Sequence, residues 1–248
     1  MKCRLCNNEA ILKDSHIIPD LAYRAILDTK SHPRMVVVRD VTIGKSVDKT
    51  QQTGFKEHLL CGACEQQLSR YESYAAKELF NKPLPTPSQL DPLGRLVMIE
   101  KLEYKPLKLF LISLLWRAGV ASHDFFKCVK LGPHETILHQ MLLDENPGAA
   151  TDYGCTVCSL LPEHEIDFRE VMFQPFQTRT DGHNGYLFVL RGLAFSFYIS
   201  NHRLSTSIKQ SFLSEEGNLP IVRMRIGNFQ PLCKLWNRGV NAIHSAPE

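Results

Sequence analysis

Two Cys-x-x-Cys pairs, Cys3/Cys6 and Cys61/Cys64, constrain the fold of this chain more than any other feature. Four thiolates in two such pairs can close one tetrahedral zinc site, and a small segment with too little core can be folded by its metal. The segment between the pairs contains His16, which a shared zinc would hold close to the site. The alternative is two unrelated pairs of buried or redox thiols. The short strands and the helix expected around the pairs favour zinc.

Length and composition limit the number of domains and the class of protein. With 248 residues, 44% of them hydrophobic, the chain can form one or two domains that each bury a core. No basic stretch leads into an apolar run, so we expect no signal peptide. The longest apolar run, Leu109 to Trp116, is too short to span a membrane. Eight cysteines without an export signal favour thiols and metal over disulfides, and we expect a cytoplasmic protein.

The net charge of +3 is small, and all of the excess falls in residues 1–105. A weakly phosphate-attracting surface would produce this imbalance, and so would chance. The loop 28–58 interleaves basic residues with small polar ones, which suits contacts to a phosphate backbone and equally suits any solvated loop. The candidate nucleic-acid contacts in this region are Arg34, Arg39, Lys45 and Lys56.

Prolines indicate where the chain divides into domains. Residues 1–82 are expected to form a zinc-stapled module with the basic loop inserted in it, and residues 83–104 a proline-rich linker. Residues 105–248 are expected to form an α+β domain with an antiparallel sheet. The role of this domain stays open between sensing, dimerisation and targeting, and it offers a surface for a homo-oligomer or a protein partner.

Hydrophobic periodicity predicts the elements of each part. In the module we expect strands at 10–12, 35–38 and 59–61, and helices at 20–27 and 65–80. In the domain we expect helices at 107–120 and 134–143, strands at 171–176 and 219–226, and a hairpin at 186–199 that turns at Arg191-Gly192.

A further Cys-x-x-Cys, Cys155/Cys158, lies in the second part of the chain. Two buried thiols are the interpretation we favour for this pair, with a second zinc site or redox chemistry as alternatives. His164 lies six residues after this pair, and a second zinc would need a fourth ligand, for which the candidates are Cys128, His134, His139 and Cys233.

The N-terminal motifs resemble a known family. Cys-x-x-Cys, then Asp-Ser-His-Ile-Ile-Pro, then Leu-Leu-Cys-x-x-Cys followed by a helix, is similar to the zinc-bearing HNH endonucleases of the ββα-metal, treble-clef type. The resemblance covers about residues 1–75. It implies a histidine that acts as general base and a preceding Asp that binds the catalytic metal. It also implies a His or Asn metal ligand directly after the last zinc cysteine, and an Asn that orients the base.

Mapped residue by residue, the resemblance places His16 at the position of the base. Ser15 occupies the position of the metal-binding Asp, and Asp14 is next to it. Glu65 stands where the family has His or Asn, and it remains a suitable oxygen ligand for a divalent cation. Residues 56–58, Lys-Glu-His, occupy the neighbourhood of the orienting Asn.

The sequence therefore predicts an HNH-like endonuclease that hydrolyses phosphodiester bonds, of DNA more than of RNA. His16 would be the catalytic base, since a neutral imidazole can accept a proton from water. Glu65 and Asp14 would hold catalytic Mg²⁺ or Mn²⁺, and the four cysteines of the first two pairs would hold structural Zn²⁺.

Other interpretations stay open at this stage. His16 would have a structural role if it bonded the hairpin, or would be a zinc ligand if it replaced a cysteine. The whole chain would then be a non-catalytic zinc-finger protein that binds nucleic acid or protein, or a structural subunit.

Overall fold

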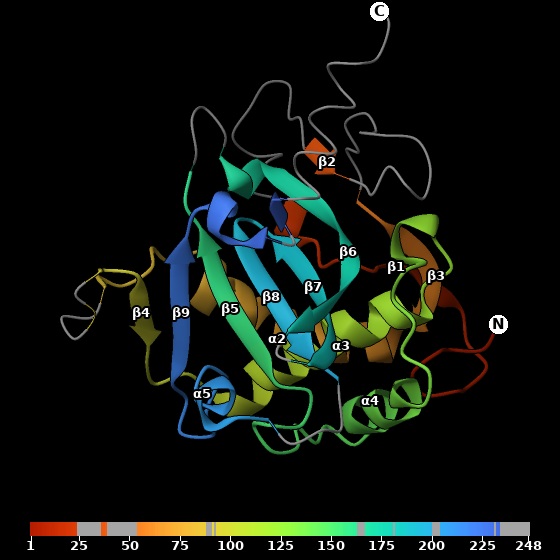
Figure 1. The fold of residues 1–248 in the computed structure, drawn as a ribbon. Helices are drawn as coiled ribbons and strands as arrows, with labels where there is room; N and C mark the ends of the chain where they lie inside the picture. Colours follow the sequence, from red (N-terminus) through yellow and green to blue (C-terminus); the bar gives the residue numbers. More distant parts are fainter. Residues whose placement is uncertain are drawn as a thin grey trace, which may run out of the picture.

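The computed structural model describes residues 1–23, 36–38, 54–87, 91, 93–162, 167–180, 182–199, 204–230 and 232–233, with only the backbone described for 36–38. The described residues form a mixed α+β structure, as the sequence predicts. A large twisted sheet lies across the molecule, helices α2, α3 and α4 pack behind and below it, and a two-stranded sheet stands beside them (Figure 1).

The small sheet leads directly into a helix. Strand β1 (Leu12–His16) pairs antiparallel with β3 (Lys56–Cys61), with an irregularity in register at Lys13/Asp14. Helix α2 (Gly62–Ala75) begins where β3 ends and continues into a π-helical turn, η2 (Ala76–Phe80). The helix predicted over 65–80 is therefore present and starts three residues earlier. Its buried face is made by Cys64, Leu68, Tyr71 and Ala75.

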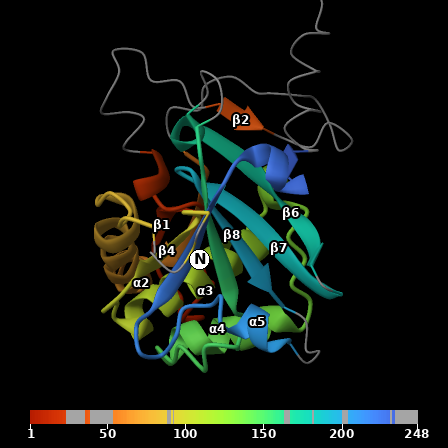
Figure 2. The same ribbon diagram turned by 60° about the vertical axis from the view of Figure 1, so that its left-hand side comes forward.

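Helix α3 (Tyr104–Val120) runs through the middle of the core. Its sequence is apolar on nearly every side, which is typical of a helix enclosed by other elements. It packs between α2, α4 (His134–Leu143) and one face of the large sheet (Figure 2). No helix of the described part combines the length and apolar character needed to cross a bilayer.

The large sheet has seven strands within the described residues. In spatial order they are β2 (Val36–Val38), β6 (Val171–Thr180), β7 (His183–Leu190), β8 (Leu193–Tyr198), β5 (Cys155–Leu160), β9 (Leu219–Met224) and β4 (Leu96–Ile99). The expected hairpin at Arg191-Gly192 is confirmed, because β7 and β8 pair from Leu190 and Leu193 outward.

The sheet is mixed, and this corrects the expectation of an antiparallel one. Strand β9 lies parallel to β5, and β2 lies parallel to β6. Both pairings join strands that are far apart in the chain; the short helix α5 (Thr206–Lys209) lies between β8 and β9. Long connections of this kind let a strand return in the same direction, which a short hairpin turn does not allow.

Several contacts join the predicted module to the rest of the chain. Strand β4 forms inside the segment 83–104 and pairs with β9. The backbone amides of Ser122 and His123 donate to the carboxylate of Glu57, a residue of β3. One cluster of buried residues includes side chains from both sides of this segment. The division of the chain at 83–104 stays a prediction.

Short 3-10 turns complete the described structure. They are η3 (Asp124–Phe126), η4 (Phe168–Glu170) and η5 (Ile226–Asn228). Phe168, at the start of η4, packs with Phe173, Leu187 and Val189 over the sheet face opposite α3. Buried side chains therefore pack against both faces of the large sheet.

Lys108 is an ion buried inside this core. It lies in α3, and its ammonium donates to the carbonyls of Ala150 (3.2 Å) and Tyr153 (3.3 Å). Its side chain thereby ties α3 to the loop before β5. Burial lowers the pKa of Lys108 to about 8, against the weaker attraction of nearby acidic groups.

This pKa predicts how stability depends on pH. Below pH 8 both the folded and the unfolded chain hold the proton; between pH 8 and the usual lysine value of 10.5 the folded chain loses it first. Stability then rises with pH. The free energy of unfolding of wild type relative to Lys108→Met should increase by about 2 kcal/mol between pH 7.5 and 9.5, at ~1.4 kcal/mol per unit. Urea unfolding of both proteins at the two values measures this, and an unchanged difference would contradict it.

Candidate metal centre and adjoining acidic pocket

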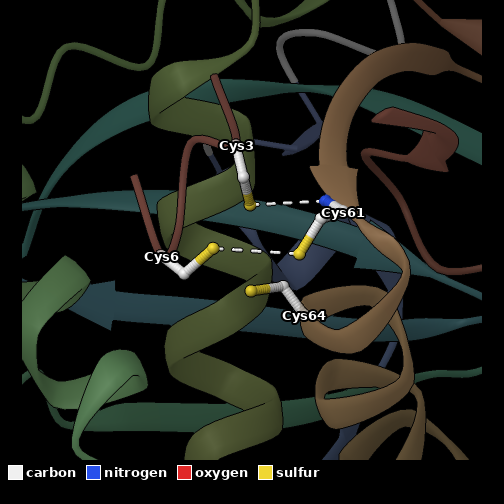
Figure 3. A group of neighbouring side chains, drawn as sticks. All are labelled: Cys3, Cys6, Cys61 and Cys64. Atoms are coloured by element: carbon white, nitrogen blue, oxygen red, sulfur yellow. Dashed lines mark hydrogen bonds between the residues drawn. The ribbon is translucent and has the colours of Figure 1, made fainter. Parts of the chain in front are cut away.

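The sulfur atoms of Cys3, Cys6, Cys61 and Cys64 gather at one point, all within 4.8 Å of one another (Figure 3). Cys3 and Cys6 come from the N-terminal loop, Cys61 ends β3, and Cys64 lies in the first turn of α2. In a tetrahedral zinc–thiolate site, bond lengths of about 2.3 Å place the sulfurs roughly 3.8 Å apart. The Cys6 and Cys61 sulfurs are 3.8 Å apart. The predicted cluster is confirmed as a group able to hold a metal such as zinc.

The donor set favours a thiolate-binding metal. The backbone amide of Cys61 donates to the Cys3 sulfur at 3.3 Å. Burial acts to raise the pKa of Cys3, but amides of Cys6, Cys61 and Leu5 outweigh it and lower the pKa to about 7. Burial and the neighbouring sulfurs raise the pKa of Cys64. A buried sulfur group of this kind suits a metal cation, because the cation stabilises every thiolate at once.

The N-terminal loop has the conformation of a tight knuckle. The amide of Cys3 donates to the carbonyl of Asn8 (2.9 Å), and the amide of Asn7 donates to the carbonyl of Cys3 (3.0 Å). Asn7 adopts a φ of 60°, a left-handed conformation that asparagine tolerates well. His139 of α4 contacts the carbonyl of Leu5 through Nε2 at 2.6 Å. The knuckle is thus anchored to the second part of the chain.

His16, at the end of β1, faces an open pocket of about 530 Å³ beside this cluster. The pocket is bounded by the chain after β1, one face of α2 and η2, and the turn between β7 and β8. Its lining residues are His16, Asp20, Leu21, Glu65, Ser69, Glu72, Ser73, Ala76, Asn81 and Arg191. Three carboxylates, one imidazole and one guanidinium therefore share one space.

The helical repeat explains why α2 places two carboxylates, Glu65 and Glu72, in the same pocket. Steps of three and four residues place a set of side chains on one side of a helix. The stripe that lines the pocket comprises Glu65, Ser69, Glu72 and Ala76. It is shifted by one residue from the buried stripe of the same helix. The packing of α2 against the core therefore turns these polar side chains toward His16.

The surroundings of His16 favour a neutral ring. Burial is the largest cause that lowers its pKa below 6.5, and the nearby Lys56 adds to the effect, while Asp20 opposes it. The Nε2 atom lies 3.7 Å from Oδ1 of Asp20. The carbonyl of His16 accepts a hydrogen bond from Arg117 at 2.8 Å, which fixes the backbone at this point. At pH 7 the imidazole is therefore able to accept a proton.

The other two carboxylates of the pocket also have partners inside the protein. Glu72 pairs with the buried guanidinium of Arg117, with Oε1 and Nη2 2.5 Å apart. Glu65 accepts a hydrogen bond of 2.7 Å from the hydroxyl of Ser15, a fully buried side chain whose oxygen also accepts from the amide of Leu60 (3.3 Å). Ser15 thus fixes the position of Glu65 relative to the strand that carries His16.

The predicted site residues are only partly brought together. His16 and Glu65 line the same pocket, and His16 is not part of the sulfur group. Asp14 is exposed, lies 4.0 Å from Lys56 and does not line the pocket. The candidate contacts Arg34, Arg39 and Lys45 lie outside the described residues. The role of Lys56, which is described, stays a prediction.

The pocket also contains residues that sequence reasoning missed. Asp20 lies four residues after His16, beyond Pro19, and Glu72 lies seven residues after Glu65 on the same helix face. These spacings are a signal that could have identified both. Arg191 comes from a distant hairpin turn, and no local pattern relates it to His16.

Cys155 and Cys158 do not form a chelating pair. They lie three positions apart on β5, and residues three apart on a strand point to opposite faces. Cys155 packs in the core on the α3 side, and Cys158 packs against the cluster on the other face. Burial raises the pKa of both thiols, that of Cys158 to about 11. The interpretation as two buried thiols fits this arrangement.

Three comparisons with known proteins returned no match: no family model, no curated protein and no solved structure resembles the chain closely enough to be reported.

The sulfur cluster predicts a defined metal content. Purified protein should contain about one zinc per chain, and Cys64→Ser should lose most of it and unfold at a lower temperature, because the metal joins the knuckle to α2. Cys158→Ser is the matched control and should keep its zinc. Elemental analysis and thermal unfolding measure both effects. Equal zinc content in all three proteins would contradict this assignment.

Proposed function

We propose that the protein is an HNH-like, metal-dependent endonuclease that hydrolyses phosphodiester bonds of nucleic acid, DNA more than RNA. The observation that carries the proposal is that His16 and Glu65, which come from different elements, line one open pocket beside the cysteine cluster. The general base and the metal ligand of such an enzyme need this proximity.

The arrangement of the N-terminal elements supports the proposal. Two antiparallel strands are followed by a helix, and the cysteine pairs lie in the knuckle before β1 and at the junction of β3 with α2. We assign this part to the ββα-metal, treble-clef type. In this scaffold the zinc is structural, and the strand end and helix face beside it carry the chemistry.

The charge of the pocket supports a metal-dependent reaction. Carboxylates of Asp20 and Glu65 would repel a phosphodiester unless a cation stood between them. Oxygen ligands of this kind suit Mg²⁺ or Mn²⁺. We assign Glu65 and Asp20 as the residues that would hold the catalytic cation, with Asp20 in the place that the sequence suggested for Asp14. When bound, the cation supplies positive charge to the phosphate oxygens and acidifies water.

His16 would act as the general base. The imidazole accepts a proton from water, the water oxygen forms a bond to phosphorus, and the bond from phosphorus to the leaving sugar oxygen breaks. The leaving oxygen takes a proton from solvent, and His16 returns its own to solvent afterwards. Oδ1 of Asp20 lies 3.7 Å from Nε2, which places this proposed cation ligand next to the base.

An alternative function is a non-catalytic zinc module that binds nucleic acid or protein. The observation that favours it is the hydrogen bond between Ser15 and Glu65, because it occupies one oxygen of the proposed metal ligand. Ser15 also stands where the resembling nucleases carry a metal-binding Asp.

Plasmid cleavage tests the proposal. Zinc-loaded protein should nick supercoiled DNA in Mg²⁺ or Mn²⁺, and His16→Ala should lower the rate by roughly 100-fold or more, since general-base catalysis contributes about that much. Glu65→Gln should be similarly impaired. His58→Ala, which removes an exposed histidine from the neighbouring strand outside the pocket lining, is the matched control and should cleave normally.

Two results would overturn the proposal. One is cleavage by His16→Ala at the wild-type rate. The other is the absence of cleavage with every divalent cation, together with salt-sensitive DNA binding that needs no Mg²⁺ and survives His16→Ala, which would establish the alternative.

A further inference from the structure

A second cavity, of about 370 Å³, adjoins the acidic pocket. On one side lie the end of η2 and the proline-rich segment that follows it. On the other side lie the end of β5, the start of β8 and the end of β9. One side is apolar and contains Phe80, Pro83 and Leu84. Among the described residues that line it, one is acidic, Asp167, and the cationic ones are Lys82, Arg169, Arg191 and Arg223. We call this cavity the basic groove.

Two cations of the basic groove are already paired. Arg169 donates to both oxygens of Asp167, at 3.0 and 2.8 Å from Nε, and Lys82 pairs with Glu78 at 2.5 Å. Arg191 and Arg223 make no ion pair within the part of the chain that the structure describes. Among the described residues, two positive charges of the groove are therefore uncompensated, and an anion is the complementary ligand.

Arg191 is held in an unusual position. It occupies the first place of the two-residue turn between β7 and β8, with a φ of 47°, followed by Gly192 at 77°. Such turns favour asparagine or glycine, and arginine is strained there. The Nε atom of Arg191 is buried and has no hydrogen-bond partner in the described structure. Backbone strain combined with an unpaired buried hydrogen-bond donor is typical of a residue that binds a ligand.

Arg191 also connects the two cavities, because its side chain lines both. Its guanidinium carbon lies 5.6 Å from the centre of the Phe80 ring, and one terminal nitrogen donates to the carbonyl of Leu21 at 3.4 Å. The Phe80 ring thus supports the guanidinium on one side, and the guanidinium can donate hydrogen bonds to a phosphate oxygen.

We propose that the basic groove binds the nucleotide adjacent to the scissile phosphodiester, in a single-stranded segment of nucleic acid. This inference rests on the proposed function of the acidic pocket. Arg191 and Arg223 contact the phosphate, and the apolar side of the groove receives the unpaired base. The size of the cavity suits one small ligand of this kind, whereas bases paired in a duplex are not available to enter it.

Fluorescence anisotropy with a labelled single-stranded oligothymidylate tests this, on the zinc-loaded full chain without added Mg²⁺. Arg191→Asn should weaken binding at least fivefold while leaving the unfolding temperature close to that of wild type, because asparagine suits the turn. Arg223→Gln should weaken binding by a similar factor. Arg179→Gln removes the same charge from an exposed position outside the groove and is the matched control, which should bind like wild type.

Equal affinity of wild type, Arg191→Asn and Arg223→Gln would overturn the assignment. If the matching duplex binds more tightly than the single strand, the proposal that the groove binds single-stranded nucleic acid is wrong. Displacement of the probe by micromolar thymidine monophosphate would instead identify a site for a free nucleotide.

These experiments test the groove assignment and the endonuclease proposal separately. If oligonucleotide binding depends on Arg191 and Arg223 but no cation supports cleavage, the groove assignment is correct and the endonuclease proposal is wrong. If cleavage depends on His16 but is unchanged in both arginine variants, the groove assignment alone is wrong.

Discussion

The meeting of four cysteine sulfurs is the constraint on which the arrangement of the candidate site depends. It joins the first residues of the chain to the point where β3 becomes α2. Leu12 pairs with Cys61, and after the irregularity at Lys13/Asp14 the strands pair again from Asp14 with His58. In this register Ser15 points inward to Glu65 and His16 faces the pocket. A metal ion bound by all four sulfurs would strengthen this link, because it would hold the N-terminal loop to the junction of β3 and α2.

A buried arginine transmits this arrangement to the rest of the protein. Arg117 has 1% of its side chain exposed, and it binds both the carbonyl of His16 and the carboxylate of Glu72. A buried guanidinium without such partners would be strongly destabilising. Helix α3, which carries Arg117, is enclosed by the sheet and by α2 and α4, so the position of His16 is coupled to the central core.

How much of the structure can be predicted from the sequence depends on how far apart in the chain the interacting residues lie. The helix at 134–143 was predicted at its observed bounds, and the cysteine cluster follows from spacing alone, because both are local patterns. The parallel pairing of β9 with β5 and the strand β4 within the expected linker were not predicted, since they depend on partners far along the chain. Arg117 illustrates the same limit, because its burial is set by elements that its own neighbours in sequence do not reveal.

We propose that the pocket shared by Glu65 and His16 binds a catalytic divalent cation. Mn²⁺ titration of the zinc-loaded protein, followed by electron paramagnetic resonance, tests it most directly because free and bound Mn²⁺ give different signals. We expect one Mn²⁺ site, whose affinity Glu65→Gln lowers at least tenfold. Asp14→Asn, a change at an exposed carboxylate outside the pocket, should leave this affinity unchanged. No bound Mn²⁺, or equal binding by wild type and Glu65→Gln, would contradict it.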